Sequence, residues 1–280
     1  KANLTIYKEG EVLTGANVTE EGVSFVYEKR RQKGAVYNVY AAADIKRADG
    51  TVVYKQGALV KENLTTGDDG SATLKGLYLG TYRVTEMKAP TNLICAGESK
   101  EVTLSYAGQN VEVAVGDLTF VNDRQKAEVF AEKQDKDTKK PLAGAVFGLY
   151  AGKDIKNQDG QVVVAKDTLI AKATTDEMGS GAFAADIPNN NSYYVKELQA
   201  PANYFRNSDE VYSFDFQYTN DKEATVSFSH TFSNEHVSAS IHLVKKDKET
   251  GNVTQGDAKF AGAVYGVYAR ENIAHPDGKS

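Results

Sequence analysis

The stretch YRVTEMKAP, residues 82–90, is the most informative part of this 280-residue chain, and YYVKELQAP, residues 193–201, repeats it. In a β-strand, alternate side chains point to the same face. Glu86 follows a tyrosine and a valine on alternate positions, so the pattern that buries two apolar side chains also directs a carboxylate into the core. A lone glutamate of this kind commonly marks a strand end that reaches solvent. The second copy, however, places Glu197 in the same way.

The chain is an internal repeat around these two stretches. GAVYNVYAAADIKRADG begins at Gly34, GAVFGLYAGKDIKNQDG at Gly144 and GAVYGVYARENIAHPDG at Gly262. Asp-Gly is a turn signal, so each copy predicts a strand, a short loop and a tight turn. A short strand ending in lysine precedes each copy, and the two complete units end on TFVN or TFSN. Such a repeat has to be recognised before the fold is assigned.

These boundaries predict a domain over residues 1–124, a second over 125–236 and the incomplete N-terminal part of a third over 237–280. Short alternating segments separated by turns, with little helical periodicity, predict an all-β fold of tandem antiparallel β-sandwiches. The junctions between the units are short and poor in glycine and serine. We therefore expect stiff, end-to-end joints.

Composition and charge exclude several classes of function. A net charge of −5 without a basic patch offers no footprint for nucleic acid. No apolar run approaches the roughly 20 residues needed to span a bilayer. The chain shows neither a signal peptide nor a sorting tail, so it reads as a segment of a longer protein. Cys95 is the single cysteine, which excludes an intramolecular disulfide. His230, His236 and His242 would not converge on strands, so we expect no metal and no cofactor.

Each complete unit holds a lysine, a glutamate and an asparagine that continue an apolar alternation toward the core. They are Lys8, Glu86 and Asn122 in the first unit and Lys133, Glu197 and Asn234 in the second. Lysine and asparagine stand at opposite ends of each unit in sequence, but the first and last strands of a sandwich can be neighbours. An isolated buried charge is costly, so three matched polar positions call for a chemical explanation.

Covalent chemistry provides that explanation. Burial disfavours charge, which pushes a lysine toward its neutral amine and a carboxyl group toward its protonated form. A neutral amine is a nucleophile. A protonated carboxyl group can polarise the asparagine carbonyl and move the proton from the amine to the leaving group. The predicted product is a Lys–Asn amide, formed with loss of ammonia, so the buried charges are consumed.

The combination resembles the Cna-B domains, collagen-adhesin B-type or SpaA-like, of Gram-positive surface proteins and pilins. The resemblance rests on the lysine strand and on three stretches: PLAGAVFGLY (141–150), YVKELQAP (194–201) and TFSN (231–234). It implies a transthyretin-like, inverse-immunoglobulin sandwich closed by an autocatalytic isopeptide bond. By position it implies Lys8–Asn122 and Lys133–Asn234 bonds, with Glu86 and Glu197 as the catalytic residues.

The sequence also departs from this family. Members often have Pro-x-Gly-Tyr after the glutamate strand, whereas Asn92 and Asn203 occupy the glycine place here. Asparagine tolerates a left-handed backbone, so the turn can be kept. Lys29 is a rival to Lys8 as the nucleophile of the first unit, and we prefer Lys8 because its strand pattern matches the other two lysine strands. Lys245 is the corresponding lysine of the third unit and has no visible partner.

The main functional hypothesis is a structural stalk segment of a cell-wall-anchored surface protein or adhesin of a Gram-positive bacterium, extracellular and monomeric. The alternatives are a pilus shaft subunit and a domain that binds a host ligand through its loops. The expected partners are accordingly a host extracellular-matrix or cell-surface ligand, or neighbouring pilin subunits. A turnover enzyme is disfavoured, because the sequence has no glycine-rich phosphate loop, metal cluster or nucleophile–histidine pair.

Overall fold

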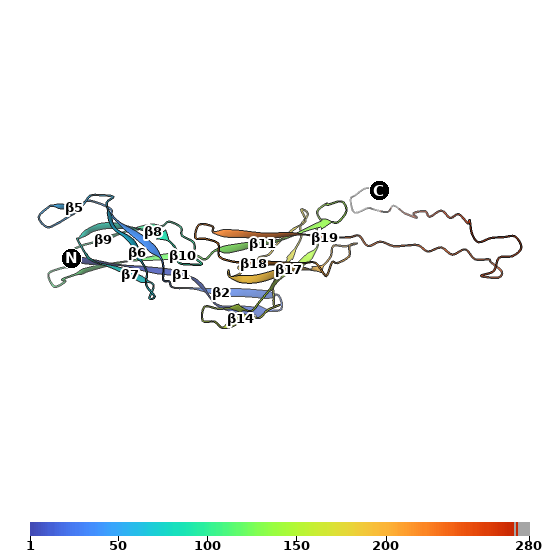
Figure 1. Cartoon of the computed structure of the whole chain (residues 1–280), viewed down its shortest axis with the longest axis horizontal. Helices are drawn as coiled ribbons and strands as arrows, with labels where there is room; N and C mark the ends of the chain where they lie inside the picture. The colour runs from blue at the N-terminus through green and yellow to red at the C-terminus, as the bar shows by residue number, and fades with distance from the viewer. Residues whose placement is uncertain (272, 274–280) are drawn as a thin grey trace.

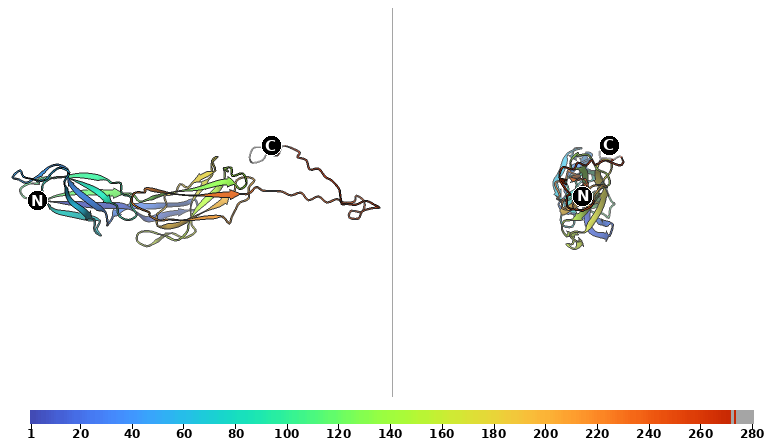
Figure 2. Two further views of the ribbon diagram at one scale, coloured as in Figure 1. Left: turned by 45° about the horizontal axis from the view of Figure 1, so that its top comes forward. Right: turned by 90° about the vertical axis from the view of Figure 1, so that its right-hand side faces the viewer.

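The computed structural model describes residues 1–271 and 273, and it contains two β-sandwiches placed end to end. An extended arm, residues 237–271, continues beyond the second sandwich (Figure 1). Seen along its length the molecule is narrow (Figure 2). The described residues contain no helix, and so none that is long and apolar enough to cross a membrane. The all-β tandem sandwich fold predicted from the sequence is confirmed.

The first sandwich has ten strands in two main sheets. Its strands are β1 (Ala2–Thr19), β2 (Gly22–Arg31), β3 (Val36–Ala41), β4 (Ile45–Lys46), β5 (Val52–Tyr54), β6 (Leu59–Thr65), β7 (Ser71–Leu77), β8 (Gly80–Lys88), β9 (Ser99–Leu104) and β10 (Ala114–Asn122). One sheet has the order β10-β1-β2, with β7 also pairing to β1, and the other has the order β6-β3-β8-β9. Strands β4 and β5 form a separate two-stranded ribbon.

The second sandwich repeats this plan with nine strands. They are β11 (Lys126–Asp135), β12 (Val146–Ala151), β13 (Ile155–Lys156), β14 (Val162–Val164), β15 (Leu169–Thr174), β16 (Ser180–Ala182), β17 (Asn191–Gln199), β18 (Val211–Phe216) and β19 (Thr225–Asn234). The sheets have the orders β16-β11-β19 and β15-β12-β17-β18, with a β13–β14 ribbon beside them. The glutamate strands of the sequence repeat are therefore β8 and β17, each in the sheet that faces the lysine strand.

The first and last strands of each sandwich are neighbours and run parallel. β1 pairs with β10, and β11 pairs with β19. Every other pairing between strands is antiparallel within the described residues. A parallel pair needs a long crossover connection, and here the rest of the unit supplies it. The sandwiches are thus antiparallel except where their two terminal strands meet.

Strict alternation buries one face of each terminal strand. Ala2, Leu4, Ile6 and Lys8 alternate along β1, and all four are fully buried. Three are apolar and stabilise the core by their removal from water, at about 25 cal/mol per Å² of apolar surface. Lys8 lies on the same face and brings an amine group into the core. The period of the strand, rather than any preference of lysine, carries this side chain into the core.

The β1–β2 hairpin reaches past the first sandwich and packs on the second. Leu13, Ala16, Val23 and Phe25 of this hairpin contact the hydrophobic core of the second sandwich. At its base, the Tyr27 hydroxyl donates a hydrogen bond of 2.8 Å to the Asp186 carbonyl oxygen. The sequence marks this segment only as an insertion between Lys8 and Gly34. The joint between the sandwiches is therefore a packed interface and not only a short connection.

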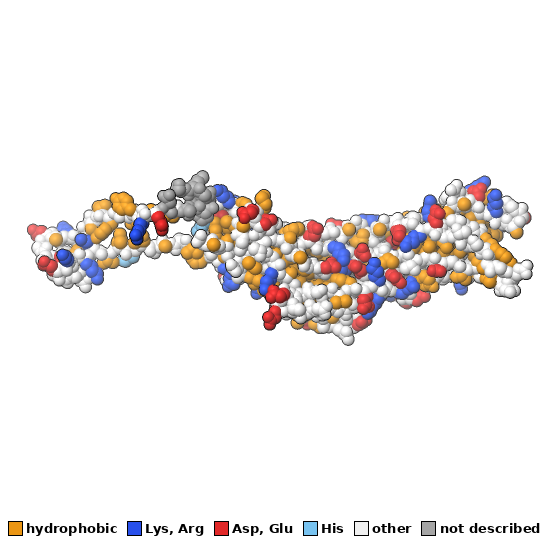
Figure 3. Space-filling view, turned by 180° about the vertical axis from the view of Figure 1, so that it is seen from behind, with side chains coloured by type: hydrophobic (Ala, Val, Ile, Leu, Met, Phe, Trp, Pro, Cys, Tyr) orange, Lys and Arg blue, Asp and Glu red, His pale blue; other side chains and the backbone are white. Residues whose placement is uncertain are grey.

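The arm does not form the strand expected around Lys245. Residues 237–271 contain no strand, and the side chains of Ile241, Leu243 and Lys245 are exposed. Figure 3 shows hydrophobic side chains along the arm. A single strand can neither pair its backbone groups nor bury a face. Beyond Val237, whose N–H donates to the Asn203 carbonyl oxygen at 2.9 Å, no described strand pairs with the arm. The expected Asp-Gly turn at 277–278 and the end of the third unit lie outside the described residues.

Candidate functional site

The parallel register brings lysine and asparagine of the first sandwich to one face. Lys8 of β1 lies opposite Phe120 of β10, and Gly10 lies opposite Asn122. Asn122 is therefore displaced by two residues from Lys8 along the strands, and both point into the core. Glu86 of β8 reaches them from the facing sheet. Three segments far apart in the sequence thus meet at one point.

These three side chains form a buried cluster, the first site. The Lys8 ammonium nitrogen lies 2.9 Å from a carboxylate oxygen of Glu86. The Asn122 amide nitrogen donates to both carboxylate oxygens of Glu86, at 3.0 and 2.9 Å. All three residues are at most 3% exposed. The carboxylate therefore contacts both the amine and the amide nitrogen, away from water.

The second site repeats the arrangement with Lys133, Glu197 and Asn234. Lys133 lies opposite Phe232 in the register, two residues before Asn234. The Lys133 nitrogen is 3.2 Å from Glu197 and donates a hydrogen bond of 2.6 Å to the Asn234 carbonyl oxygen. The Asn234 amide nitrogen donates to both oxygens of Glu197, at 2.9 and 3.1 Å. Here the amine already contacts the carbonyl group that it would attack.

The first site differs from the second at two polar atoms, the Lys8 nitrogen and the Tyr37 hydroxyl oxygen. The Lys8 nitrogen makes no hydrogen bond of acceptable geometry to the described residues, although Glu86 is near. Tyr37 lies opposite Glu86 in the sheet, and its buried hydroxyl also lacks a partner among the described residues. Phe147 takes the matching place beside Glu197 in the second sandwich. The exchange of Tyr37 for Phe147 carries no warning in the sequence, because tyrosine and phenylalanine are both common in strands.

Burial sets the protonation of both lysines. Desolvation lowers the pKa of Lys8 below its usual value, and the adjacent carboxylate of Glu86 opposes this effect. Desolvation likewise lowers the pKa of Lys133, and the charge of Glu197 opposes it. At the second site the Lys133 nitrogen lies 5.9 Å from the centroid of the Phe147 ring, and this ring packs against Phe232 with the two centroids 4.7 Å apart. Burial therefore shifts both lysines toward the neutral amine, which is the nucleophilic form.

The other lysines considered from the sequence lie elsewhere. The Lys29 side chain is 52% exposed and its nitrogen is 3.9 Å from Asp123, so the structure does not bring it to the first site. Lys245 is exposed on the arm. Asn92 and Asn203 have positive φ angles of 75° and 69°, as the turns after the glutamate strands require.

A turn beside the second site was not recognised from the sequence. Asp135 accepts hydrogen bonds from the backbone and side chain of Thr138 and from the Tyr204 hydroxyl. Burial raises the pKa of Asp135, but these hydrogen bonds outweigh it and bring the pKa to about 2. The arm forms the same turn between Asp247 and Thr250. The shared Asp-x-x-Thr spacing was the signal that could have revealed it.

No group of three or more histidine, cysteine or carboxylate side chains suited to a metal is found among the residues that the structure describes. The polar side chains of both sites are committed to each other, with lysine and glutamate adjacent and the asparagine amide bonded to the carboxylate. Chemically, such a set of groups could supply a nucleophilic amine, a proton carrier and a carbonyl group whose amide nitrogen can leave.

A comparison with protein families matches the SpaA prealbumin-like fold domain at residues 21–119 and again at 127–231. The chain belongs to this SpaA family. Its two matched regions lie in the first and second sandwiches, so the family assignment and the strand topology agree. None of the curated proteins matches the chain.

Solved structures give further comparisons for this SpaA-family chain. The Bacillus anthracis TIE protein matches with 24% identity and a TM-score of 0.53, which supports the fold, over 84% of this chain and 34% of that one. This chain thus spans about a third of that protein's length. A streptococcal ancillary pilin matches at 20% identity and a TM-score of 0.31, over 84% of this chain and 62% of that one. The shaft pilin SpaA of Lactobacillus rhamnosus GG matches at 16% and 0.29, over 86% and 99%.

Proposed function

We propose that the chain is a structural stalk segment whose sandwiches are each closed by an amide, Lys8–Asn122 in the first and Lys133–Asn234 in the second. The observation that carries this proposal is the burial of a lysine, a glutamate and an asparagine in mutual contact at matched places. An ion pair alone is a weak explanation, since buried pairs rarely improve on apolar packing. The units would follow residues 1–124 and 125–236, with a third beginning near 237.

The proposed reaction is balanced without any cofactor. A proton first passes from the lysine to the glutamate, which leaves a neutral amine and a carboxylic acid. The amine nitrogen attacks the asparagine carbonyl carbon and forms the new C–N bond. Glu86 or Glu197 then delivers a proton to the amide nitrogen, which leaves as ammonia while the attacking nitrogen loses its extra proton to the carboxylate. One ammonia is released for each amide formed. The glutamate then still holds the proton that it took from the lysine, and passing this proton to the departing ammonia, which leaves as ammonium, restores the carboxylate.

The hydrogen bonds support these roles. In both sites the amide nitrogen of the asparagine points at the carboxylate, which is where a proton for the leaving group is needed. In the second site the lysine contacts the opposite end of the same amide. Groups held in contact in this way react with effective molarities of about 10⁵ M or more. A reaction that is slow in solution is therefore plausible within the folded chain.

The parallel pairing supports a load-bearing role. Parallel first and last strands enter and leave a sandwich at opposite ends, so tension along the chain pulls the two strands past each other. An amide from Lys8 to Asn122 would pass that tension directly from β1 to β10. The remainder of the sandwich would then be shielded from it. This suits a stalk on the outside of a Gram-positive cell, in a surface adhesin or in a pilus, whose partners would be host ligands or neighbouring subunits.

The mass of the intact, denatured protein tests the proposal. Two amides predict a mass lower than that of the printed sequence by two ammonia molecules. Glu86→Gln and Glu197→Gln should each restore one of them, and the double variant should restore both. Lys29→Gln is the matched control, because this exposed lysine lies outside the first site. A parent protein with the full sequence mass would overturn the proposed bonds.

A further inference from the structure

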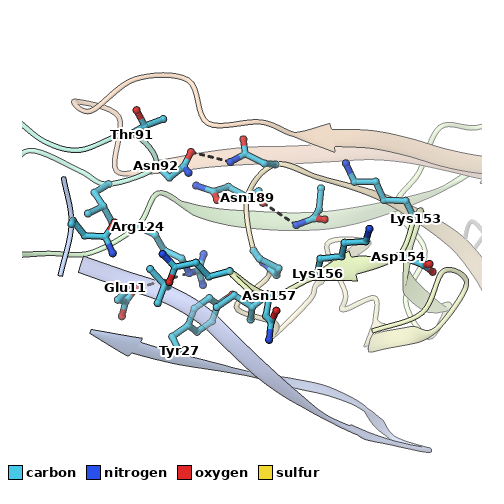
Figure 4. A pocket seen from close by; sticks show the side chains of 18 of the residues that line it. Glu11, Tyr27, Thr91, Asn92, Arg124, Lys153, Asp154, Lys156, Asn157 and Asn189 are labelled. Carbon is cyan, nitrogen blue, oxygen red and sulfur yellow. Dashed lines mark hydrogen bonds and ion pairs between the residues drawn. The ribbon is translucent and has the colours of Figure 1, made fainter. Parts of the chain in front are cut away.

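A cleft of about 820 Å³ lies where the two sandwiches meet. The β1–β2 hairpin, residues 91–93 and Arg124 form one side, and residues 153–158 and 188–191 of the second sandwich form the other (Figure 4). Ligand sites commonly lie between domains and have volumes of about 300–1,000 Å³. None of the six residues of the two sites lines the cleft, although Arg124 follows Asn122 of the first site by two residues.

Two buried side-chain donors belong to residues of this cleft and have no hydrogen-bond partner among the described residues. Four buried side-chain polar atoms lack a hydrogen-bond partner among the described residues, and two of them, on Lys8 and Tyr37, belong to the first site. The other two are Arg124 Nε and Asn189 Nδ2, and both residues line the cleft. The Arg124 side chain is only 4% exposed, and its Nε lies 4.0 Å from Glu11, beyond hydrogen-bond distance. Both atoms are donors, so a ligand that satisfies them has to bring acceptors.

The charge of the cleft also favours an acceptor-rich ligand. Its cationic side chains outnumber its carboxylates by four to two, although the whole chain carries a net charge of −5. The cationic residues are Arg124, Lys153, Lys156 and Lys166. The three lysines are exposed and form no ion pair with any described residue. Glu11 is already paired with Lys126 at 3.1 Å, and Arg124 is paired with Asp186, so the positive excess lies in the three lysines. A local positive excess of this kind attracts anions.

The remaining lining indicates the class of anion. Five asparagines and two glutamines line the cleft, and Val12, Leu13, Leu93 and Pro188 add apolar surface beside them. An amide offers a donor and an acceptor together, which matches a hydroxyl group, and lysine matches a carboxylate. A peptide, by contrast, is usually held by an unpaired sheet edge or by apolar pockets. We propose that this cleft binds an acidic saccharide, a chain of hydroxyl-rich sugars that carry carboxylates.

Titration with a tetrasaccharide of alternating glucuronic acid and N-acetylglucosamine tests this proposal. Saturable binding is expected in calorimetry, with NMR shifts of the Arg124 Nε–H and the Asn189 side-chain amide. Exchanging both rim lysines, as Lys153→Glu and Lys156→Glu together, should weaken binding at least tenfold. Lys61→Glu with Lys75→Glu makes the same change of charge at exposed lysines outside the cleft and should leave binding unaltered.

Three results would overturn the proposal. The first is the absence of saturable binding, which would leave water as the partner of the two donors. The second is equal binding of neutral tetra-N-acetylglucosamine, or equal weakening by the control pair, because either removes the role of the cleft lysines. The third is tighter binding of a tetraglutamate peptide, which would identify a protein partner. None of these outcomes depends on the isopeptide bonds, whose presence the intact mass reports separately.

Discussion

Replacing Lys133 by methionine and Glu197 by glutamine together removes the proposed bond of the second sandwich without leaving a charge in its core. The methionine keeps most of the length of the lysine stem, and the glutamine keeps the shape of the carboxylate. Both parent side chains are at most 1% exposed, so neither replacement meets water. The double variant therefore isolates the effect of the cross-link on stability.

The expected magnitude follows from the length of the closed loop. Lys133 and Asn234 are 101 residues apart. By analogy with disulfides, closing a loop of this length removes unfolded-state entropy worth about 4.7 kcal/mol. For a unit near 100 residues this corresponds to a fall in Tm of about 20 °C. Glu197→Gln alone should cost a further 3–5 kcal/mol or so, because it leaves the Lys133 ammonium buried without its partner.

Scanning calorimetry, with the intact mass of each sample measured beside it, provides the assay. The transition of the second sandwich should move to lower temperature in the double variant and still lower in Glu197→Gln, while the first sandwich serves as an internal reference. Two results would refute the reasoning. One is a double variant that lacks the bond by mass and yet melts with the parent. The other is a single variant that melts above the double variant.

Three further predictions concern other parts of the molecule. Tyr37→Phe removes a buried hydroxyl that has no partner among the described residues, so the first sandwich should be as stable as the parent or more stable by about 1 kcal/mol. Phe147→Tyr makes the reverse change and should destabilise the second sandwich by about 1–3 kcal/mol. Urea unfolding measures both. In Glu197→Gln, the pKa of Lys133 is near 10.5 in the unfolded chain and lower in the folded chain. Between these two values the unfolded state binds more protons, so the free energy of unfolding should rise with pH toward 10.5. Chemical denaturation at several pH values measures this, and a free energy of unfolding that does not change with pH would contradict it. Phe25→Ala, although in the first unit by sequence, should lower the unfolding free energy of the second sandwich by about 2 kcal/mol, and an effect confined to the first would disprove the packing role of the hairpin.

The repeat made much of the fold and of both sites predictable. One copy of a buried glutamate pattern is ambiguous. Two copies are not, because each follows a lysine strand and precedes an asparagine at nearly the same distance, 36 residues in one unit and 37 in the other. The structure places Glu86 and Glu197 in contact with these partners, as the alternation of the strands predicts. Periodicity of two residues decides the face of a side chain, which is why so local a pattern was informative.

Features that depend on pairing between distant strands were out of reach. The parallel direction of β1 and β10 follows from the path of the whole unit, and no local pattern encodes it. The cleft collects residues from many separate segments of both units, so its lysines appeared in the sequence as ordinary surface charges. In the arm, the alternating pattern around Lys245 predicted a strand that the structure does not contain. Alternation forms a strand only where another strand is available to pair with it.

The β1–β2 hairpin also has a consequence for synthesis at the ribosome. The first sandwich emerges and folds before the second, because domains generally fold as units in order of translation. During that interval Val23 and Phe25 have no core to contact, since their partners belong to the second sandwich. The hairpin is then a preformed platform on which the later strands can collapse. Successive units of such a stalk would mature in sequence, each guided by the one made before it.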